Sequence, residues 1–102
     1  MDAMRPGSAA QPHPDDLAVD RFAEAMRQKM ALSRVKGRGG WQTASAEHLT
    51  LLLLHHLEKG DPVDIANFSM MLHENGFSLS SETVRVYRNI KKELYSSTEA
   101  KE

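Results

Sequence analysis

Turn and cap residues divide the chain into four stretches whose apolar residues recur at helical spacing, and this division constrains the fold most. The start of the third stretch is the clearest: in GDPVD, Asp61 can cap a helix, Pro62 suits the first helical position and Asp64 falls in the first turn. No stretch alternates apolar and polar residues long enough to predict a strand. The sequence therefore predicts an all-α, small four-helix domain. The first two helices are expected over about residues 15–36 and 46–59, the third from Pro62 to the ENG of residues 74–76, and the fourth after a cap at Ser80 or Ser81, with fraying after Ser96.

Each predicted helix carries one apolar face. The first helix, which we expect Asp15 or Asp16 to cap and Gly37 to end, places on its face Val19, Phe22, Met26 and Met30. We expect the second helix to be the most buried, because its face is the widest and holds Leu49, Leu52, Leu53 and Leu57, with Leu51 and Leu54 beside them. The core is thin for 102 residues, so the sequence favours a homo-oligomer in which a partner subunit buries more apolar surface.

Length and composition bound the remaining organisation. We expect residues 1–14, which hold three prolines, to be a disordered leader, residues 15–96 to be a single domain, and residues 97–102 to be a frayed tail. Without cysteine, the chain has no disulfide framework, no thiolate nucleophile and no cysteine-rich zinc site. The sequence shows no secretory signal, and its longest aliphatic run is too short to span a bilayer. We therefore expect a cytoplasmic protein with no membrane partner.

A net charge of −1 argues against a strong general affinity for DNA or anionic membranes, but it hides basic patches. Residues 21–38 hold six cations and one acid, and the predicted fourth helix adds a second cluster made of Arg85, Arg88, Lys91 and Lys92. Either patch can meet phosphate groups.

The connection VKGRGGW between the first two predicted helices combines two cations, three glycines and the only tryptophan of the chain. Glycines let a backbone approach a ligand closely, Arg38 can pair with a phosphate beside Lys36, and Trp41 can stack on a base. Alternatively, the connection is a hinge in which the glycines turn the chain and Trp41 fills a gap between helices. The pattern is neither a Walker loop nor a dinucleotide fingerprint.

A second group of polar residues surrounds the end of the second predicted helix. His55 and Glu58 share a helix face, Asp61 and Asp64 can pair as carboxylates, and Asn67 lies one turn further on. These five are weak candidates for metal ligands. The alternatives are exposed histidines on a helix surface and carboxylates that serve only to start a helix. No nucleophile, base and acid combine into a catalytic set, so we predict no catalytic residue.

The stretch from Phe22 to Gly76 resembles a group of small, mostly uncharacterised proteins encoded by phages and prophages. The matching pattern is FAEAMRQKM…KGRGGW…HLTLLLLHHLEKGDPVDIANFSMML. This resemblance implies an accessory protein of a mobile genetic element and no established reaction.

The same stretch is similar to the MazG-type all-helical nucleotide pyrophosphohydrolases, which hold magnesium with an ExxE pair and an ExxD pair. DPVD places Asp61 and Asp64 in the second pair, whereas HHLE places His55 and Glu58 where that family has two glutamates. Magnesium prefers oxygen ligands, so this resemblance implies lost catalysis with phosphate binding kept. Magnesium is an expected cofactor only under the pyrophosphohydrolase alternative.

The C-terminal half, DIANFSMMLHENGFSLSSETVRVYRNIKKEL, looks like a helix-turn-helix. That resemblance implies that the last helix enters the major groove of DNA, with Arg85 near the bases and Arg88 near phosphates.

The sequence favours a non-enzymatic accessory protein that binds a nucleotide or nucleic acid. The expected ligand-binding residues are Lys36, Arg38 and Trp41, with Arg85 and Arg88 as a second surface. Three alternatives stay open: a helix-turn-helix DNA-binding regulator, a degenerate MazG-like pyrophosphohydrolase, and an inhibitor or adaptor that binds a host protein.

Overall fold

The computed structural model describes the backbone of residues 11–100 and the side chains of residues 11–95. The predicted disordered leader covers residues 1–14, of which residues 1–10 lie outside the described residues. The predicted frayed tail covers residues 97–102, of which residues 101–102 lie outside them.

The described chain is all-α, as predicted. Its elements, in order, are α1 (Pro14–Val35), the short 3-10 helix η2 (Trp41–Thr43), α2 (Ala46–Leu57), α3 (Pro62–Glu74) and α4 (Ser81–Ala100). Residues 11–100 contain no strand, and no helix among them has an apolar stretch long enough for a bilayer crossing.

The helix starts follow local chemistry, with one correction. Asp61 caps α3, since its Oδ1 accepts a hydrogen bond from the N–H of Val63 at 2.9 Å. The cap of α1, however, is His13, whose Nδ1 accepts from the N–H of Asp15 at 3.0 Å. The prediction of Asp15 or Asp16 was wrong because Pro14, which has no N–H to donate, takes the first helical position and moves the cap to the residue before it.

The predicted helix ends were less accurate than the starts. The second helix ends at Leu57, before the predicted Lys59. The fourth helix continues to Ala100, past the Ser96 at which the sequence placed its end.

The core lies between α2 and α3. Its buried apolar side chains are Leu49, Leu53, Leu54 and Leu72. The wide leucine face predicted for α2 is narrower in the structure, because α2 packs against α3 and α4 and leaves Leu51 and Leu57 about half exposed.

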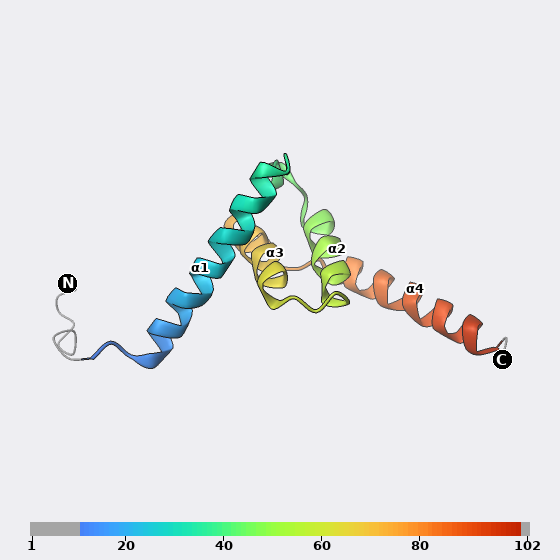
Figure 1. The fold of residues 1–102 in the computed structure, drawn as a ribbon. Helices are drawn as coiled ribbons and strands as arrows, with labels where there is room; N and C mark the ends of the chain where they lie inside the picture. Colours follow the sequence, from blue (N-terminus) through green and yellow to red (C-terminus); the bar gives the residue numbers. More distant parts are fainter. Residues whose placement is uncertain (1–10, 101–102) are drawn as a thin grey trace.

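The four helices form a small body with two long projections (Figure 1). The C-terminal part of α1 packs against α3, and the first turns of α4 pack against α2. The other ends of α1 and α4 project from two sides of the body, toward the lower left and the lower right of Figure 1. The described chain is elongated as a result, with extents of 64 × 30 × 25 Å.

A buried hydroxyl attaches the connection between α3 and α4 to the core. The side chain of Thr50 on α2 is fully buried, and its Oγ1 accepts a hydrogen bond from the N–H of Ser80 at 2.9 Å. The Ser80 side chain in turn accepts from the N–H of Thr83 at 3.1 Å and thereby caps α4. One threonine thus fixes where α4 begins.

Replacing Thr50 with valine keeps the shape of the side chain and removes this acceptor. The Ser80 N–H is then left without its protein partner, and we expect the free energy of unfolding to fall by about 1–3 kcal/mol. Urea denaturation followed by circular dichroism measures the change. Thr83→Val is the matched control, because the hydroxyl of Thr83 makes no hydrogen bond to the described residues and only its backbone N–H is bonded. Equal stability of the two variants would show that the Thr50 hydroxyl does not anchor α4.

Candidate functional site

The connection between α1 and η2 is a sharp, open bend. Gly37 has a φ of 84°, and its N–H donates to the carbonyl of Arg34 at 2.9 Å while the N–H of Arg38 donates to the carbonyl of Ser33 at 3.0 Å. This pair of bonds is a Schellman motif, which requires the left-handed conformation that glycine adopts without strain. Gly40, with a φ of 82°, makes a second turn into η2.

Trp41 contributes to the fold as the hinge interpretation proposed. Its side chain is half-buried and packs against the cluster of Leu49, Leu53 and Leu72. Its carbonyl accepts a hydrogen bond from the Nδ2 of Asn75 at 2.9 Å. The indole is not sealed in the core, however, because it also lines a groove beside the bend.

That groove has a volume of about 1,020 Å³ and is lined both by residues of the bend and by residues of the helices. It lies among the C-terminal part of α1, the bend, η2, α2 and α3. Its apolar lining includes Leu49, Leu52 and Met71, and its aromatic lining includes Trp41 and Phe68. The ring of His56 lies against that of Phe68, with 4.7 Å between the centroids, and also lines the groove.

The charged lining of the groove is almost entirely positive. The cations are Lys29, Arg34, Lys36, Arg38 and Lys59, and the acid is Asp64. Within the described part of the chain, only Lys29 among these cations forms an ion pair. The structure thus places the predicted residues Lys36, Arg38 and Trp41 around one groove.

Two groove cations did not stand out individually in the sequence. Arg34 belongs to the basic stretch of residues 21–38, so the sequence showed its charge but did not show that it lines the groove. Lys59 reaches the groove from the end of α2, and only the packing of the helices shows it. The other predicted pair, Arg85 and Arg88, is exposed on α4 and does not line the groove.

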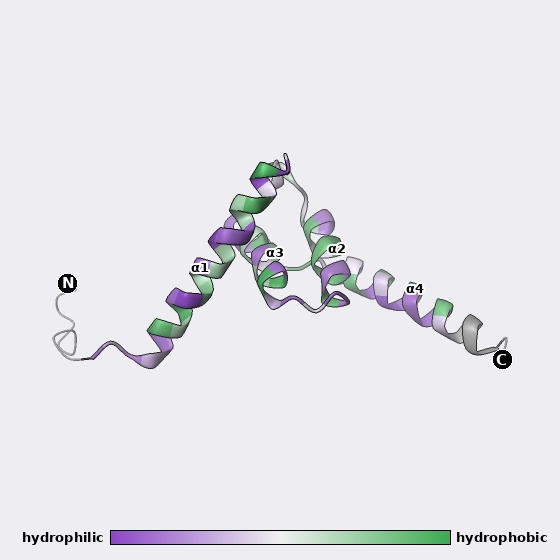
Figure 2. Ribbon diagram, viewed as in Figure 1, coloured by the Kyte–Doolittle hydropathy of each residue, from purple (hydrophilic) through white to green (hydrophobic). Residues whose placement is uncertain are grey.

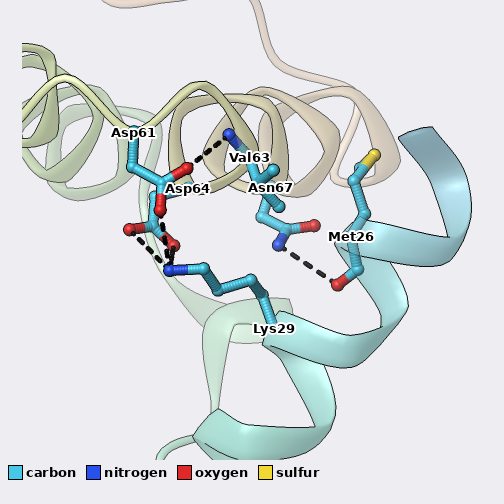
Figure 3. Close-up of polar contacts among 6 residues, drawn as sticks. All are labelled: Met26, Lys29, Asp61, Val63, Asp64 and Asn67. Atoms are coloured by element: carbon cyan, nitrogen blue, oxygen red, sulfur yellow. Dashed lines mark hydrogen bonds and ion pairs between the residues drawn. The ribbon is translucent and has the colours of Figure 1, made fainter.

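An ion-pair cluster holds α1 against α3 (Figure 3). The Nζ of Lys29 lies 2.8 Å from Oδ2 of Asp61 and 3.4 Å from Oδ1 of Asp64. Beside it, the Nδ2 of Asn67 donates to the carbonyl of Met26 at 3.3 Å. Both contacts join the middle of α1 to the first turns of α3, and so position the C-terminal end of α1 above the groove.

The same cluster shifts the proton affinities of its members. The hydrogen bond from Lys29, together with that from the backbone N–H of Val63, lowers the pKa of Asp61 below its usual value. The hydrogen bond to Asp61 raises the pKa of Lys29, although desolvation acts in the opposite direction. Both shifts favour the charged pair.

The five weak metal candidates do not form a metal site. Asp61 and Asp64 bind the ammonium of Lys29, and Asn67 bonds to the backbone of α1. Glu58 accepts from the hydroxyl of Tyr87 at 2.8 Å and pairs with Lys91 at 2.6 Å, while the ring of His55 is exposed. Within the described residues, no three histidine, aspartate or glutamate side chains gather as metal ligands. These residues therefore do not fit the magnesium ion that the MazG resemblance implies.

The C-terminal half departs from a helix-turn-helix in the length of its turn. Residues 75–80 separate α3 from α4, a connection longer than the usual tight turn. The first turns of α4 pack against α2, and Glu58, the residue that follows α2, contacts both Tyr87 and Lys91 of α4. The geometry therefore favours the groove over the α4 surface as the candidate site.

Comparisons with protein families, with curated proteins and with solved structures found nothing that matches this chain. The resemblances to phage-encoded proteins, to MazG-type enzymes and to helix-turn-helix proteins stay predictions. The candidate site consequently depends on geometry and charge alone.

The Lys29–Asp61 pair makes the stability depend on acid pH. Because the pKa of Asp61 is lower in the folded chain than its usual value of 3.8, the unfolded chain binds the proton first, and the stabilisation is lost as the pH falls from about 4 through the folded value. We expect the urea midpoint to drop over this range, and to drop less in Asp61→Asn, whose amide oxygen can still cap α3. Asp20→Asn, at an exposed position of α1, should keep the full drop. Identical pH profiles for all three proteins would contradict the role given to this pair.

Proposed function

We propose that this chain binds a phosphate-bearing ligand, a nucleotide or a strand of nucleic acid, in the groove beside the α1–η2 bend. One observation carries the proposal: Lys36, Arg38 and Trp41, which the sequence singled out as a group, line the same groove. The proposed role is binding without catalysis, as the sequence favours.

The charge of the groove supports phosphate as the recognised group. The cations Arg34, Lys36, Arg38 and Lys59 form no ion pair with the described acids. The acid in the lining, Asp64, already pairs with Lys29. A groove of one sign attracts anions, and the guanidinium groups can form two parallel hydrogen bonds to a phosphate.

The backbone of the bend supplies a second kind of donor. The N–H groups of Gly39 and Gly40 make no hydrogen bond to the described residues. Successive free N–H groups in a glycine-rich bend can bind an anion. A Cβ built on Gly39 would meet nothing within 4 Å, so the approach to this backbone is open.

The aromatic lining supports a ligand that also carries a ring. Trp41 shares the groove with Phe68 and His56. Bases stack on aromatic side chains with little sequence preference, at about 1–3 kcal/mol per base. Phosphate contacts and stacking together describe a nucleotide unit. No comparable observation favours a host protein as the partner.

Arg38→Gln should weaken the binding of a fluorescently labelled oligothymidine by removing one phosphate contact. The slope of log K against log salt concentration should then become shallower by about 0.7. The matched control is Arg21→Gln, which removes the same charge from an exposed part of α1 outside the groove. Fluorescence anisotropy at several salt concentrations measures both. A competing mononucleotide tells whether a single unit suffices. Equal losses in the two variants, or no binding by the unaltered protein, would contradict the proposal.

Gly39→Ala separates a ligand role of the bend from a turning role. Unlike Gly37 and Gly40, Gly39 has no positive φ, so a side chain there causes no backbone strain. A Cβ added at Gly39 meets no neighbour within 4 Å. Alanine should therefore leave the fold intact and stabilise it slightly, by about 0.4–1 kcal/mol. The methyl group should nevertheless lower the affinity for phosphate ligands several-fold, because it obstructs approach to the bend backbone. Thermal denaturation and the anisotropy titration give the two readouts. Unchanged affinity would remove the bend backbone from the binding site.

A further inference from the structure

Two helical arms extend from the body of the molecule. The first, which we call the acidic arm, is residues 14–24 of α1. The second, which we call the basic arm, is residues 85–95 of α4. Every side chain from 14 to 22 is exposed, as is every side chain from 88 to 95. Figure 1 shows the arms pointing away from the body on opposite sides.

Both arms carry large apolar side chains in water. On the acidic arm, Val19 is 64% exposed and Phe22 is 39% exposed. On the basic arm, Val86 is 44% exposed and Ile90 is 52% exposed. The spacing of each pair, three or four residues, keeps its members on one helix face, and apolar bands appear along both arms in Figure 2.

The apolar face of the acidic arm is unusual because it continues a face that is packed nearer the body. Val19 and Phe22 share their helix face with Met26, and α1 is half-buried at Met26 where it packs against α3. A seam that begins in a packed interface and runs on into solvent is typical of a surface that a partner covers.

The arms carry opposite charge. Residues 14–24 hold four acids and one cation, whereas residues 85–95 hold four cations and one acid, Glu93. One of these cations, Lys91, already pairs with Glu58. Two acidic arms repel each other, and so do two basic arms, but an acidic arm attracts a basic one. The best partner for either arm is therefore the other arm of a second copy.

We propose that two copies of this chain form a reciprocal dimer, in which the acidic arm of each copy packs antiparallel along the basic arm of the other. A two-fold axis between the two copies makes the two pairs of arms equivalent, so that each copy contributes its acidic arm to one pair and its basic arm to the other. Since α1 runs toward the body and α4 runs away from it, paired arms run in opposite directions (Figure 1).

Two-fold symmetry halves the area that each seam of such a dimer has to bury. A stable interface buries about 1,200–2,000 Å² in total, and the symmetry supplies the same seam twice, so each seam needs about half. The proposal needs no ligand and stands independently of the groove, whose lining contains no residue of either arm.

Site-specific cross-linking tests the pairing directly, because the chain contains no cysteine. Phe22→Cys and Ile90→Cys copies, mixed and treated with a short bismaleimide, should cross-link to each other. Each variant alone should cross-link far less. Leu51→Cys, at a similarly exposed leucine on α2, controls for random collision. Efficient cross-linking of Ile90→Cys alone would show that basic arms pair with each other and would overturn the proposal.

Sedimentation velocity of the full chain tests whether the dimer exists. The unaltered protein should sediment as a dimer that weakens as salt screens the opposite charges. Ile90→Glu should raise the dimer dissociation constant at least about tenfold, since the change occurs in both seams. Leu51→Glu should leave the dissociation constant unchanged. A monomer at low salt and high protein concentration would overturn the proposal, as would equal effects of the two substitutions.

Discussion

The ion pairs between the ammonium of Lys29 and the carboxylates of Asp61 and Asp64 join α1 to α3, and the position of α1 on the body depends on them. No side chain of α1 is fully buried, so packing alone holds this helix weakly. The Lys29 cluster and the neighbouring hydrogen bond from Asn67 give α1 a defined position on α3. That position sets where the cations at the end of α1 lie over the groove and where its N-terminal part projects. Because partly exposed ion pairs each contribute little, the attachment depends on several contacts acting together.

The sequence predicted the elements of the fold because their signals are local. The cap at Asp61 and the turn at Gly37 act within a few residues, and the structure confirms both. The predictions were wrong where a residue's role depends on a neighbouring residue or helix. His13 became a cap through the proline that follows it. Leu51 stayed about half exposed, because no helix within residues 11–100 covers that side of α2. The sequence also ranked leucines as core but gave no sign that Thr50, among them, would be fully buried.

The candidate site was predictable in part. The bend VKGRGGW has an unusual composition of its own, so Lys36, Arg38 and Trp41 stand out from the sequence alone. Lys29 does not, because its partners lie more than thirty residues away along the chain and such pairs leave no local pattern. Asp61 and Asp64 had two local interpretations, as residues that start a helix and as weak candidates for metal ligands. Nothing near them in the sequence indicated that Lys29 would pair with both.

Trp41 has two roles in this structure, one in the core and one in the groove. The indole packs against the leucine core and also lines the groove. A ligand that enters the groove therefore changes the surroundings of the indole of Trp41, which also packs against the core. As the only tryptophan of the chain, it is an intrinsic emission probe with a single source. A spectrum that shifts on ligand addition, while the helical signal stays constant, would locate the event at this one ring without any label.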